Sequence, residues 1–262
     1  MQDLKTLFIN LCSGYGLDVF TLRRGLKGTL RMVRDYRQFS MQSRFSEDFS
    51  FGFTHPCPAD RFEQGGVASG HYFHQDLLVA RRIFESKPVR HIDIGSRVDG
   101  FVAHVASFRK IEVLDLRQIT KTVKNITFHQ FDLMDSAGQF DSGCDSLSCL
   151  HTLEHIGLGR YGDRVMVDGH LRGFQILWSI LRPGGILYLS VPIGLQRIEF
   201  NAHRVFAVRT ILDMARDKYD LLRFSFVDDL GDLHEDVDFS GAAVEKSFDC
   251  WYGCGIFEFR KK

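Results

Sequence analysis

The sequence predicts an α/β fold with a mostly parallel sheet, preceded by a helical extension. Three features of the chain lead to this prediction. Apolar runs of strand length alternate with segments of helical period from residue 89 onward, which is typical of a parallel sheet covered by helices on both faces. Hydrophobic residues make up 44% of the 262 residues, which is enough for a buried core. The first 45 residues have a helical and cationic pattern instead.

The first 88 residues are expected to form a helical and irregular extension that includes a lid. The stretch 46–69 is rich in Gly, Pro, Phe and Ser and is predicted to be irregular. Residues 71–86 are amphipathic at helical period, and the Lys87–Pro88 pair ends that helix. The domain boundary is therefore placed between residues 88 and 89.

Residues 89–262 are expected to form one domain. Its strands are predicted at 89–95, 111–116, 126–133, 144–153, 186–193, 221–229 and 253–261. Its helices are predicted at 99–108, 165–185 and 204–219. The last two strands have no helix-length segment of clear period between them, so they are expected to pair antiparallel at an edge of the sheet.

Charge and composition narrow the range of partners. Lys+Arg and Asp+Glu are equal at 33 each, so the chain lacks the broad basic field that holds nucleic acid, and none is expected. No secretory signal is recognisable, and no apolar run approaches the ~20 residues of a membrane-spanning helix. The expected location is therefore the cytoplasm, where the six cysteines stay reduced.

Four cationic residues recur at helical spacing near the N-terminus: Arg23, Lys27, Arg31 and Arg34. Because residues three and four apart share a helix face, these side chains are expected to lie together. A solvated face is the favoured interpretation, and a surface for a membrane headgroup or an acidic partner is the alternative.

Three carboxylates stand at the ends of three successive predicted strands. Asp93 precedes Gly95 in the strand-to-helix turn, Asp115 follows about twenty residues later, and Asp132 ends the third strand. The carboxyl ends of parallel strands meet at one edge of a sheet, where nucleotide-type ligands bind. Gly95 lets the backbone approach such a ligand, and Asp115 is placed to meet ribose hydroxyls.

The motif order DIG, LDL, FDL, DSLSCLHTLEH and LRPGGILYLSVP resembles class I S-adenosylmethionine (SAM)-dependent methyltransferases across about 89–262. More narrowly, DIGSRVDGF, HTLEHIGLGRYGD and FNAHRVF look like uncharacterised methyltransferase-like proteins associated with surface-polysaccharide genes. The resemblance implies a Rossmann-like sheet of seven strands, parallel apart from the last, and SAM as cofactor. It further implies contacts to the cofactor from Asp93, Gly95, Ser96, Gly100, Asp115, Leu116, Asp132, Leu133, Leu150 and His151.

The loop after the first strand departs from the family pattern D-x-G-x-G-x-G. Arg97 and Asp99 stand where the second and third glycines would be, and Gly100 comes one residue late. Arg97 is expected to bind the cofactor carboxylate with its planar guanidinium. The alternative is that Arg97 fills the site, which would leave a fold that binds something else.

Polar residues gather after the fourth strand and supply the predicted chemistry. His155 is the expected general base, oriented by Glu154 or Asp163. Residues expected to contact the acceptor are Arg160, Tyr161, His203 and Arg204. His151 and His155 are four apart, as metal ligands on one helical turn would be, but no metal ion is expected.

The predicted function is methyl transfer from SAM to an oxygen or nitrogen of a small or glycan-type acceptor in polysaccharide biosynthesis. A non-catalytic binding or scaffold protein on the same fold is the main alternative, and the departure at Arg97 is its best support. A nicotinamide-dependent oxidoreductase is a weaker alternative, since it would need a G-x-G-x-x-G turn that the chain lacks.

Overall fold

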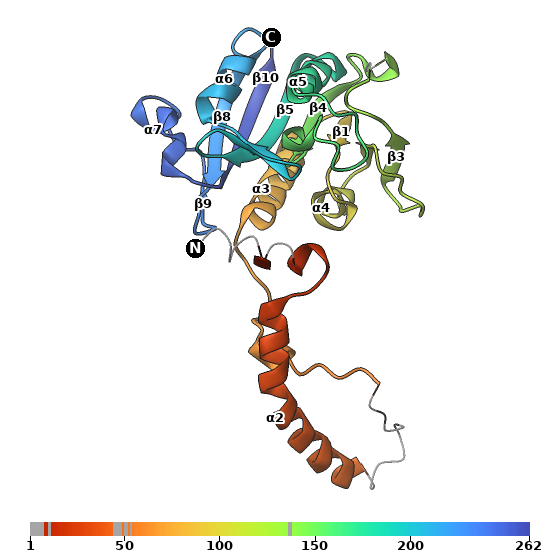
Figure 1. The fold of residues 1–262 in the computed structure, drawn as a ribbon. Coiled ribbons are helices and arrows are strands. Elements are labelled where there is room, and N and C mark those ends of the chain that lie inside the picture. The colour runs from red at the N-terminus through yellow and green to blue at the C-terminus, as the bar shows by residue number, and fades with distance from the viewer. Residues whose placement is uncertain (1–7, 10–11, 44–48, 50–51, 53, 136–137) are drawn as a thin grey trace. The chain divides into compact units, whose positions relative to one another are not determined.

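The computed structural model forms two compact units, Met1–Val67 and Ala68–Lys262 (Figure 1). It describes residues 8–9, 12–43, 49, 52, 54–135 and 138–262. Parts of the expected N-terminal extension, at 1–7, 10–11, 44–48, 50–51 and 53, lie outside the described residues. Within the described part of the chain, no helix combines the length and the apolarity that crossing a membrane requires.

The described residues of the first unit include the long helix α2 (Val19–Ser43) and the 3₁₀ turn η1 (Asp60–Phe62). Asp18 caps α2 because its Oδ1 accepts the backbone N–H groups of Phe20 (2.8 Å) and Thr21 (3.0 Å). Gly28 lets the segment around Pro58 lie against the helix, since a Cβ at that position would lie 1.8 Å from the Pro58 carbonyl oxygen.

The second unit carries the sheet and its covering helices. Its helices are α3 (His71–Ser86), α4 (Ala103–Ala106), α5 (Gly169–Ile180), α6 (Val208–Ala215) and α7 (Ala242–Glu245), with short turns η2 (Val98–Val102), η3 (Gly138–Phe140), η4 (Leu153–His155) and η5 (Ser247–Asp249). Its strands are β1 (His91–Ile94), β2 (Ile111–Asp115), β3 (Ile126–Gln130), β4 (Cys144–Leu150), β5 (Leu181–Ile193), β6 (Arg197–Glu199), β7 (His203–Val205), β8 (Tyr219–Val227), β9 (Leu233–His234) and β10 (Gly253–Lys261). Helix α3, predicted at the same residues, belongs to this unit.

The main sheet has eight strands in the order β3-β2-β1-β4-β5-β10-β8-β9. The pairs β2–β3, β1–β2, β1–β4 and β4–β5 are parallel, whereas β10 is antiparallel to both β5 and β8. The predicted Rossmann-like sheet with an antiparallel last strand is thus confirmed. The last strand does not take the edge, because it inserts between β5 and β8 and leaves the short strand β9 outermost.

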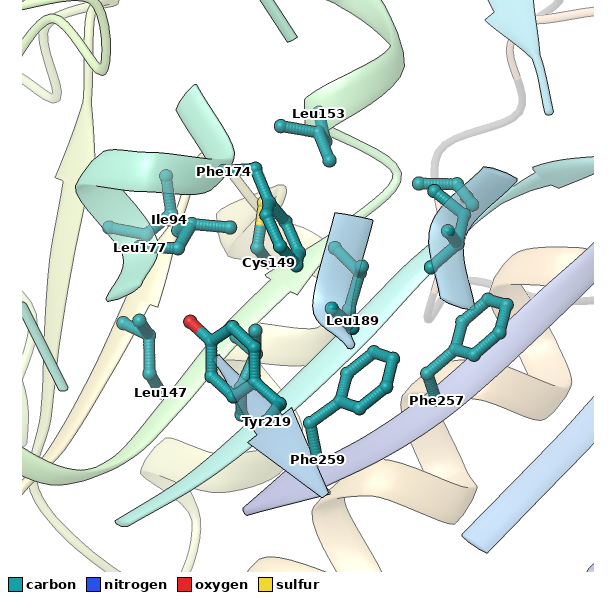
Figure 2. Close-up of a cluster of buried hydrophobic side chains, with 14 of the residues drawn as sticks. Ile94, Leu147, Cys149, Leu153, Phe174, Leu177, Leu189, Tyr219, Phe257 and Phe259 are labelled. Carbon is teal, nitrogen blue, oxygen red and sulfur yellow. The ribbon is translucent and has the colours of Figure 1, made fainter. Parts of the chain in front are cut away.

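Helices cover both faces of the sheet. On one face, α5 and α6 pack on strand residues such as Leu147, Leu189 and Phe257, and Figure 2 shows Phe174 and Leu177 of α5 in this cluster. On the other face, α3, η2 and α4 pack on a second cluster that includes Val113 and Ile256. Burial of these two apolar layers stabilises the sheet and fixes where its strand ends lie.

Two predicted helices have other bounds in the structure. The helix predicted at 165–185 is α5, Gly169–Ile180, because β5 already begins at Leu181. Residues 116–125, for which no helix was predicted, form an irregular crossover between β2 and β3. The helix predicted at 204–219 is shorter, because residues 203–205 pair antiparallel with 197–199 as the β6–β7 hairpin before α6 begins at Val208.

Candidate functional site

A pocket of about 460 Å³ opens at the carboxyl ends of β1 to β4, with further lining from α3 and from residues 155–163. This volume lies within the range of small-molecule and cofactor sites, about 300–1,000 Å³. The order of these strands brings the segments after β1, β2, β3 and β4 to one edge, as the sequence predicted. The predicted residues that line the pocket are Gly95, Ser96, Arg97, Gly100, Asp115, Leu116, Asp132, Leu133, Leu150, His151, His155, Arg160, Tyr161 and Asp163.

Asp93 supports the first loop from behind instead of lining the pocket. It is fully buried and accepts hydrogen bonds from Ser96 N–H (3.0 Å), Ser96 Oγ (2.8 Å) and Ser148 Oγ (2.5 Å). Burial raises the pKa of Asp93 to about 7, although all three hydrogen bonds act in the opposite direction. The carboxyl group therefore fixes the turn that carries Gly95 and Ser96.

Gly95 occupies a turn that no other residue fits. Its φ is +74°, and a Cβ would lie 2.6 Å from Cγ2 of Thr152, which follows β4 and also lines the pocket. The absence of a side chain lets the loops after β1 and β4 approach each other at the base of the pocket.

Arg97 lies at the exposed rim of the pocket and pairs with Asp99. Its Nε and Nη2 donate to the Asp99 carboxylate at 3.0 and 2.7 Å, and both side chains are about two-thirds exposed. The two residues that replace family glycines thus form a mutual ion pair. Such an exposed pair contributes little to stability, so Arg97 is free to exchange Asp99 for a ligand carboxylate.

Asp115, at the end of β2, is already engaged by Arg117. The Arg117 guanidinium donates to Oδ1 (3.1 Å) and Oδ2 (2.7 Å), and the Arg117 backbone N–H donates to Oδ1 (2.7 Å). Arg117 was not among the predicted site residues, although it lines the pocket and directly follows the LDL motif.

The end of β3 forms a largely apolar wall. Asp132 Oδ1 accepts the Met134 backbone N–H at 2.8 Å, so this carboxylate closes a local turn. Leu133 is buried, and Phe131 lines the pocket beside it. A flat apolar group such as an adenine ring fits between such side chains.

His151, Glu154 and His155 form a buried network after β4. His151 adopts φ +47°, an uncommon conformation for a residue with a side chain, and its Nδ1 donates to Glu154 Oε1 at 2.7 Å. Burial would raise the pKa of Glu154, but the charge and hydrogen bond of His151, the charge of His155 and a backbone hydrogen bond together lower it. Glu154 is 1% exposed and does not line the pocket, so it acts on its histidine neighbours and not on a ligand directly.

His155 lines the pocket and is oriented by the backbone. Its Nδ1 donates to the Ala202 carbonyl at 2.6 Å, which leaves Nε2 as the basic nitrogen, 3.6 Å from Glu154 Oε1. Burial lowers the pKa of His155, which favours the neutral imidazole that can accept a proton.

Asp163 organises the loop 157–163 that borders the pocket. Its carboxylate accepts the backbone N–H groups of Gly157 (2.8 Å), Gly159 (3.2 Å) and Tyr161 (3.2 Å). Tyr161 lies between two guanidinium groups, with Arg117 4.7 Å and Arg160 5.1 Å from its ring centroid. These cation–π contacts connect the loop to the end of β2 across the pocket.

His203 and Arg204 are not brought into the pocket. Arg204 is buried and donates to the carbonyls of Glu154, Ile156 and Val167, so it braces the segment after β4. The His203 ring packs against Tyr252, with centroids 5.0 Å apart.

Helix α3 contributes lining residues that the sequence did not assign to the site, namely Tyr72, Gln75 and Asp76. Gln75 and Asp76 are buried, and Gln75 Nε2 donates to Asp76 Oδ1 at 3.1 Å. The sequence offered no signal for these residues, because helical period identifies the apolar face of the helix but not which polar side chains are buried beside a pocket.

The sequence matches the profile of a family described as "Caenorhabditis protein of unknown function, DUF268" over residues 100–239, just over half of the chain. A comparison with curated proteins found no match.

Among solved structures, the chain is similar to the [4+2]-cyclase SpnF, with 16% identity, a TM-score of 0.50, and coverage of 72% of this chain and 80% of that chain. It is also similar to the 1,6-didemethyltoxoflavin-N1-methyltransferase of Burkholderia thailandensis with bound 1,6-didemethyltoxoflavin and S-adenosylhomocysteine, with 13% identity, a TM-score of 0.50, and coverage of 72% and 78%. At this level of identity the likeness shows a shared methyltransferase-type fold, which by itself does not fix an activity.

Proposed function

The chain belongs to the DUF268 family, whose description assigns no activity, and from that premise we propose that it transfers a methyl group from SAM to an oxygen or nitrogen of a small or glycan-type acceptor. The observation that carries the proposal is the pocket itself. It combines the tight turn at Gly95 with a carboxylate at the end of the neighbouring strand, Asp115, in a sheet of the methyltransferase type.

The pocket residues fit the parts of SAM in order along the sheet. Gly95, Ser96 and Gly100 would approach the methionine end, with Arg97 at its carboxylate. Asp115 would accept the ribose hydroxyls, and Leu133 would lie against adenine. Asp93 enters this proposal as the support of the first loop, because it is buried behind Ser96.

Bound SAM would supply an electrophilic methyl group, so the chain's own task is to align the acceptor and remove its proton. His155 is the proposed base. Its Nε2 is the nitrogen left without a proton, and the adjacent Glu154 would stabilise the imidazolium after proton transfer. Arg160 and Tyr161 offer polar contacts to a hydroxylated acceptor at the same end of the pocket.

Calorimetric titration with SAM, S-adenosylhomocysteine and NAD tests the cofactor assignment. We expect the first two to bind and NAD to fail. Asp115→Ala should weaken SAM binding by about 1–3 kcal/mol, because hydrogen bonds to a charged group are lost. Asp220→Ala, at an exposed position on β8, is the matched control and should bind like the unmodified protein. Equal affinity of Asp115→Ala and the control would remove the ribose assignment.

A second prediction concerns the proposed base. His155→Ala should lower turnover by about 10²–10⁴-fold, the usual contribution of a positioned acid–base group, while SAM affinity changes little. Single-turnover methylation measured with an acceptor found by screening glycans and small metabolites would test it. Retained turnover in His155→Ala would assign proton removal to another group or to solvent.

One observation favours the alternative of a binding protein without catalysis. Arg117 holds both oxygens of Asp115 and so competes with ribose hydroxyls for the same carboxylate. Under that alternative SAM would not bind even to Arg117→Ala, in which the carboxylate is released. Binding that appears or strengthens in this variant would instead identify Arg117 as a gate over a working cofactor site.

A further inference from the structure

Three metal-binding side chains converge beside the pocket from distant parts of the sequence. His71 begins α3, His151 follows β4, and Cys254 lies on β10. One donor atom of each lies within 4.8 Å of the other two. We propose that these three side chains bind a single divalent ion of the zinc class.

Each imidazole has one nitrogen committed to another group and one nitrogen available. His151 Nδ1 donates to Glu154, and its Nε2 is buried without a hydrogen-bond partner among the described residues. His71 Nε2 lies 3.2 Å from the Tyr252 carbonyl, which fixes the proton there and leaves Nδ1 with its lone pair. A buried, unpartnered nitrogen costs free energy that a bound ion would recover.

The surroundings of the two histidines match those of metal ligands. A ligating histidine almost always donates its other N–H to a carboxylate or a backbone carbonyl, which fixes its tautomer and orientation. Here Glu154 does so for His151, and the Tyr252 carbonyl does so for His71. The Glu154 carboxylate accordingly acts through His151 and does not itself reach the donor cluster.

The spacing of the donors allows one ion to bind once the side chains rotate toward it. Zn–N and Zn–S bonds of about 2.0–2.1 and 2.3 Å in tetrahedral geometry place donors about 3.3–3.7 Å apart, against the 4.8 Å limit found here. The His71 and His151 rings are parallel, with centroids 5.1 Å apart and planes inclined by 2°. Because an imidazole nitrogen binds an ion in the plane of its ring, one ring has to turn before both nitrogens reach a single ion.

The donor set decides the class of ion. Two imidazoles and one thiolate suit Zn²⁺ and related transition metals, whereas Mg²⁺ and Ca²⁺ prefer oxygen donors. Three protein ligands leave a fourth position for water or a ligand oxygen, as in catalytic zinc sites. Because binding deprotonates the Cys254 thiol, it releases a proton.

The site differs from the metal pairing that the sequence suggested, in which His151 and His155 are four residues apart. In the structure Cys254 and His151 instead meet His71, 80 or more residues away along the chain. The ion would tie the start of α3 to the ends of two strands next to the pocket, since His151 also lines it.

The proposal does not rest on SAM binding, and its test uses metals alone. Untagged full-length protein, freed of metal with a chelator, is titrated with Co²⁺ and then with Zn²⁺. We expect one equivalent of Co²⁺ to bind with a thiolate-to-cobalt charge-transfer band, which Zn²⁺ then displaces. Absence of stoichiometric binding, or binding without that band, overturns the proposal.

Three variants separate the site from other thiols. Cys254→Ser and His71→Asn should each lose the stoichiometric binding, whereas Cys250→Ser, a nearby buried cysteine, should keep the band. Glu154→Gln should still bind one equivalent of metal ion but about 10–100-fold more weakly, as when a residue that orients a metal-ligating histidine is changed. Far-ultraviolet circular dichroism identifies any variant that fails to fold, and His71→Asn, at a half-buried position, then provides the deciding measurement. An unchanged band in a folded Cys254→Ser or unchanged binding in a folded His71→Asn contradicts the site.

Discussion

Asp76 illustrates how burial alters the chemistry of one pocket side chain. It is 6% exposed, and burial raises its pKa to about 6. The nearby ionisable groups are His104 on η2–α4, His151 after β4 and Asp93 on β1. The two histidines lower the pKa of Asp76, and Asp76 raises that of Asp93. A Cβ on Gly100 would lie 3.0 Å from Asp76 Oδ2, so the carboxyl group faces the loop that would hold the methionine end of SAM.

This placement predicts a pH dependence of SAM binding. Asp76 is neutral below its pKa and anionic above it, and the anion attracts the cationic amino group of SAM. Affinity should therefore rise as pH increases through about 6. In Asp76→Asn this rise should disappear, and SAM should bind more weakly at pH 8. Calorimetry at several pH values measures both, with Asp220→Asn as the control. Parallel curves for the variant and the unmodified protein would exclude Asp76 as the group responsible.

Among the side chains that line the pocket, those that directly follow strands were largely predictable from the sequence, whereas those contributed by a helix were not. Asp115 was predictable because a strand end fixes its position at the sheet edge. Asp76 and Arg117 were not, since helical period identifies an apolar face but not which polar residue meets a pocket. His203 and Arg204 were expected at the pocket because they follow β5. In the β6–β7 hairpin neither residue lines the pocket.

Among the elements of the site, the loop 157–163 has one carboxylate, Asp163, at its centre. Three backbone N–H groups donate to Asp163, each within the loop itself. All of these contacts are internal to the loop, so the geometry favours a role for Asp163 in holding its shape rather than in orienting His155. Loops with few buried contacts open most readily. The hydrogen bonds to Asp163 are therefore expected to determine how often this loop leaves its observed conformation.

Asp163→Ala is therefore expected to loosen this loop. Loss of three hydrogen bonds, each contributing about 0.5–1.5 kcal/mol, should speed tryptic cleavage after Arg160 by about tenfold or more. Peptide mapping of limited digests gives the cleavage rate at that bond. Asp213→Ala, on the exposed side of α6, serves as the comparison. Unchanged cleavage after Arg160 would mean that the Tyr161 contacts, and not Asp163, hold the loop.

The strands of the parallel core were predictable, whereas pairing between distant segments was not. Periodicity placed β1 to β5, β8 and β10 because apolar strand runs are bounded by turn residues. The strands β6 and β7 have three residues each, and β9 has two. Segments of that length carry no measurable period, and their conformation depends on partners that the sequence does not identify.

In the second unit as a whole, Asp93 is a fully buried carboxyl group at the centre of the sheet. Burial raises its pKa to about 7, well above the ordinary range of an aspartate. The pKa values of some other groups in this unit are shifted downward. Burial lowers the pKa of His91 to about 3, whereas Arg90 lowers the pKa of Glu112. The free energy of unfolding of the unmodified protein therefore changes with pH through several opposing contributions. The contribution of Asp93 is isolated by comparing the unmodified protein with a variant that lacks this carboxyl group.

Asp93→Asn provides that difference. Between about pH 4 and pH 7 folded Asp93 keeps a proton that the unfolded chain has released, so its contribution to the free energy of unfolding is present at pH 4 and lost as pH rises to 7. Asparagine does not titrate. The stability of the unmodified protein relative to Asp93→Asn should therefore fall across this window, by on the order of a few kcal/mol at about 1.4 kcal/mol per pKa unit. Urea unfolding from pH 4 to pH 8 measures it, with Asp220→Asn as the control. A constant difference would mean that the hydrogen bonds from Ser96 and Ser148 keep the carboxylate ionised in spite of its burial.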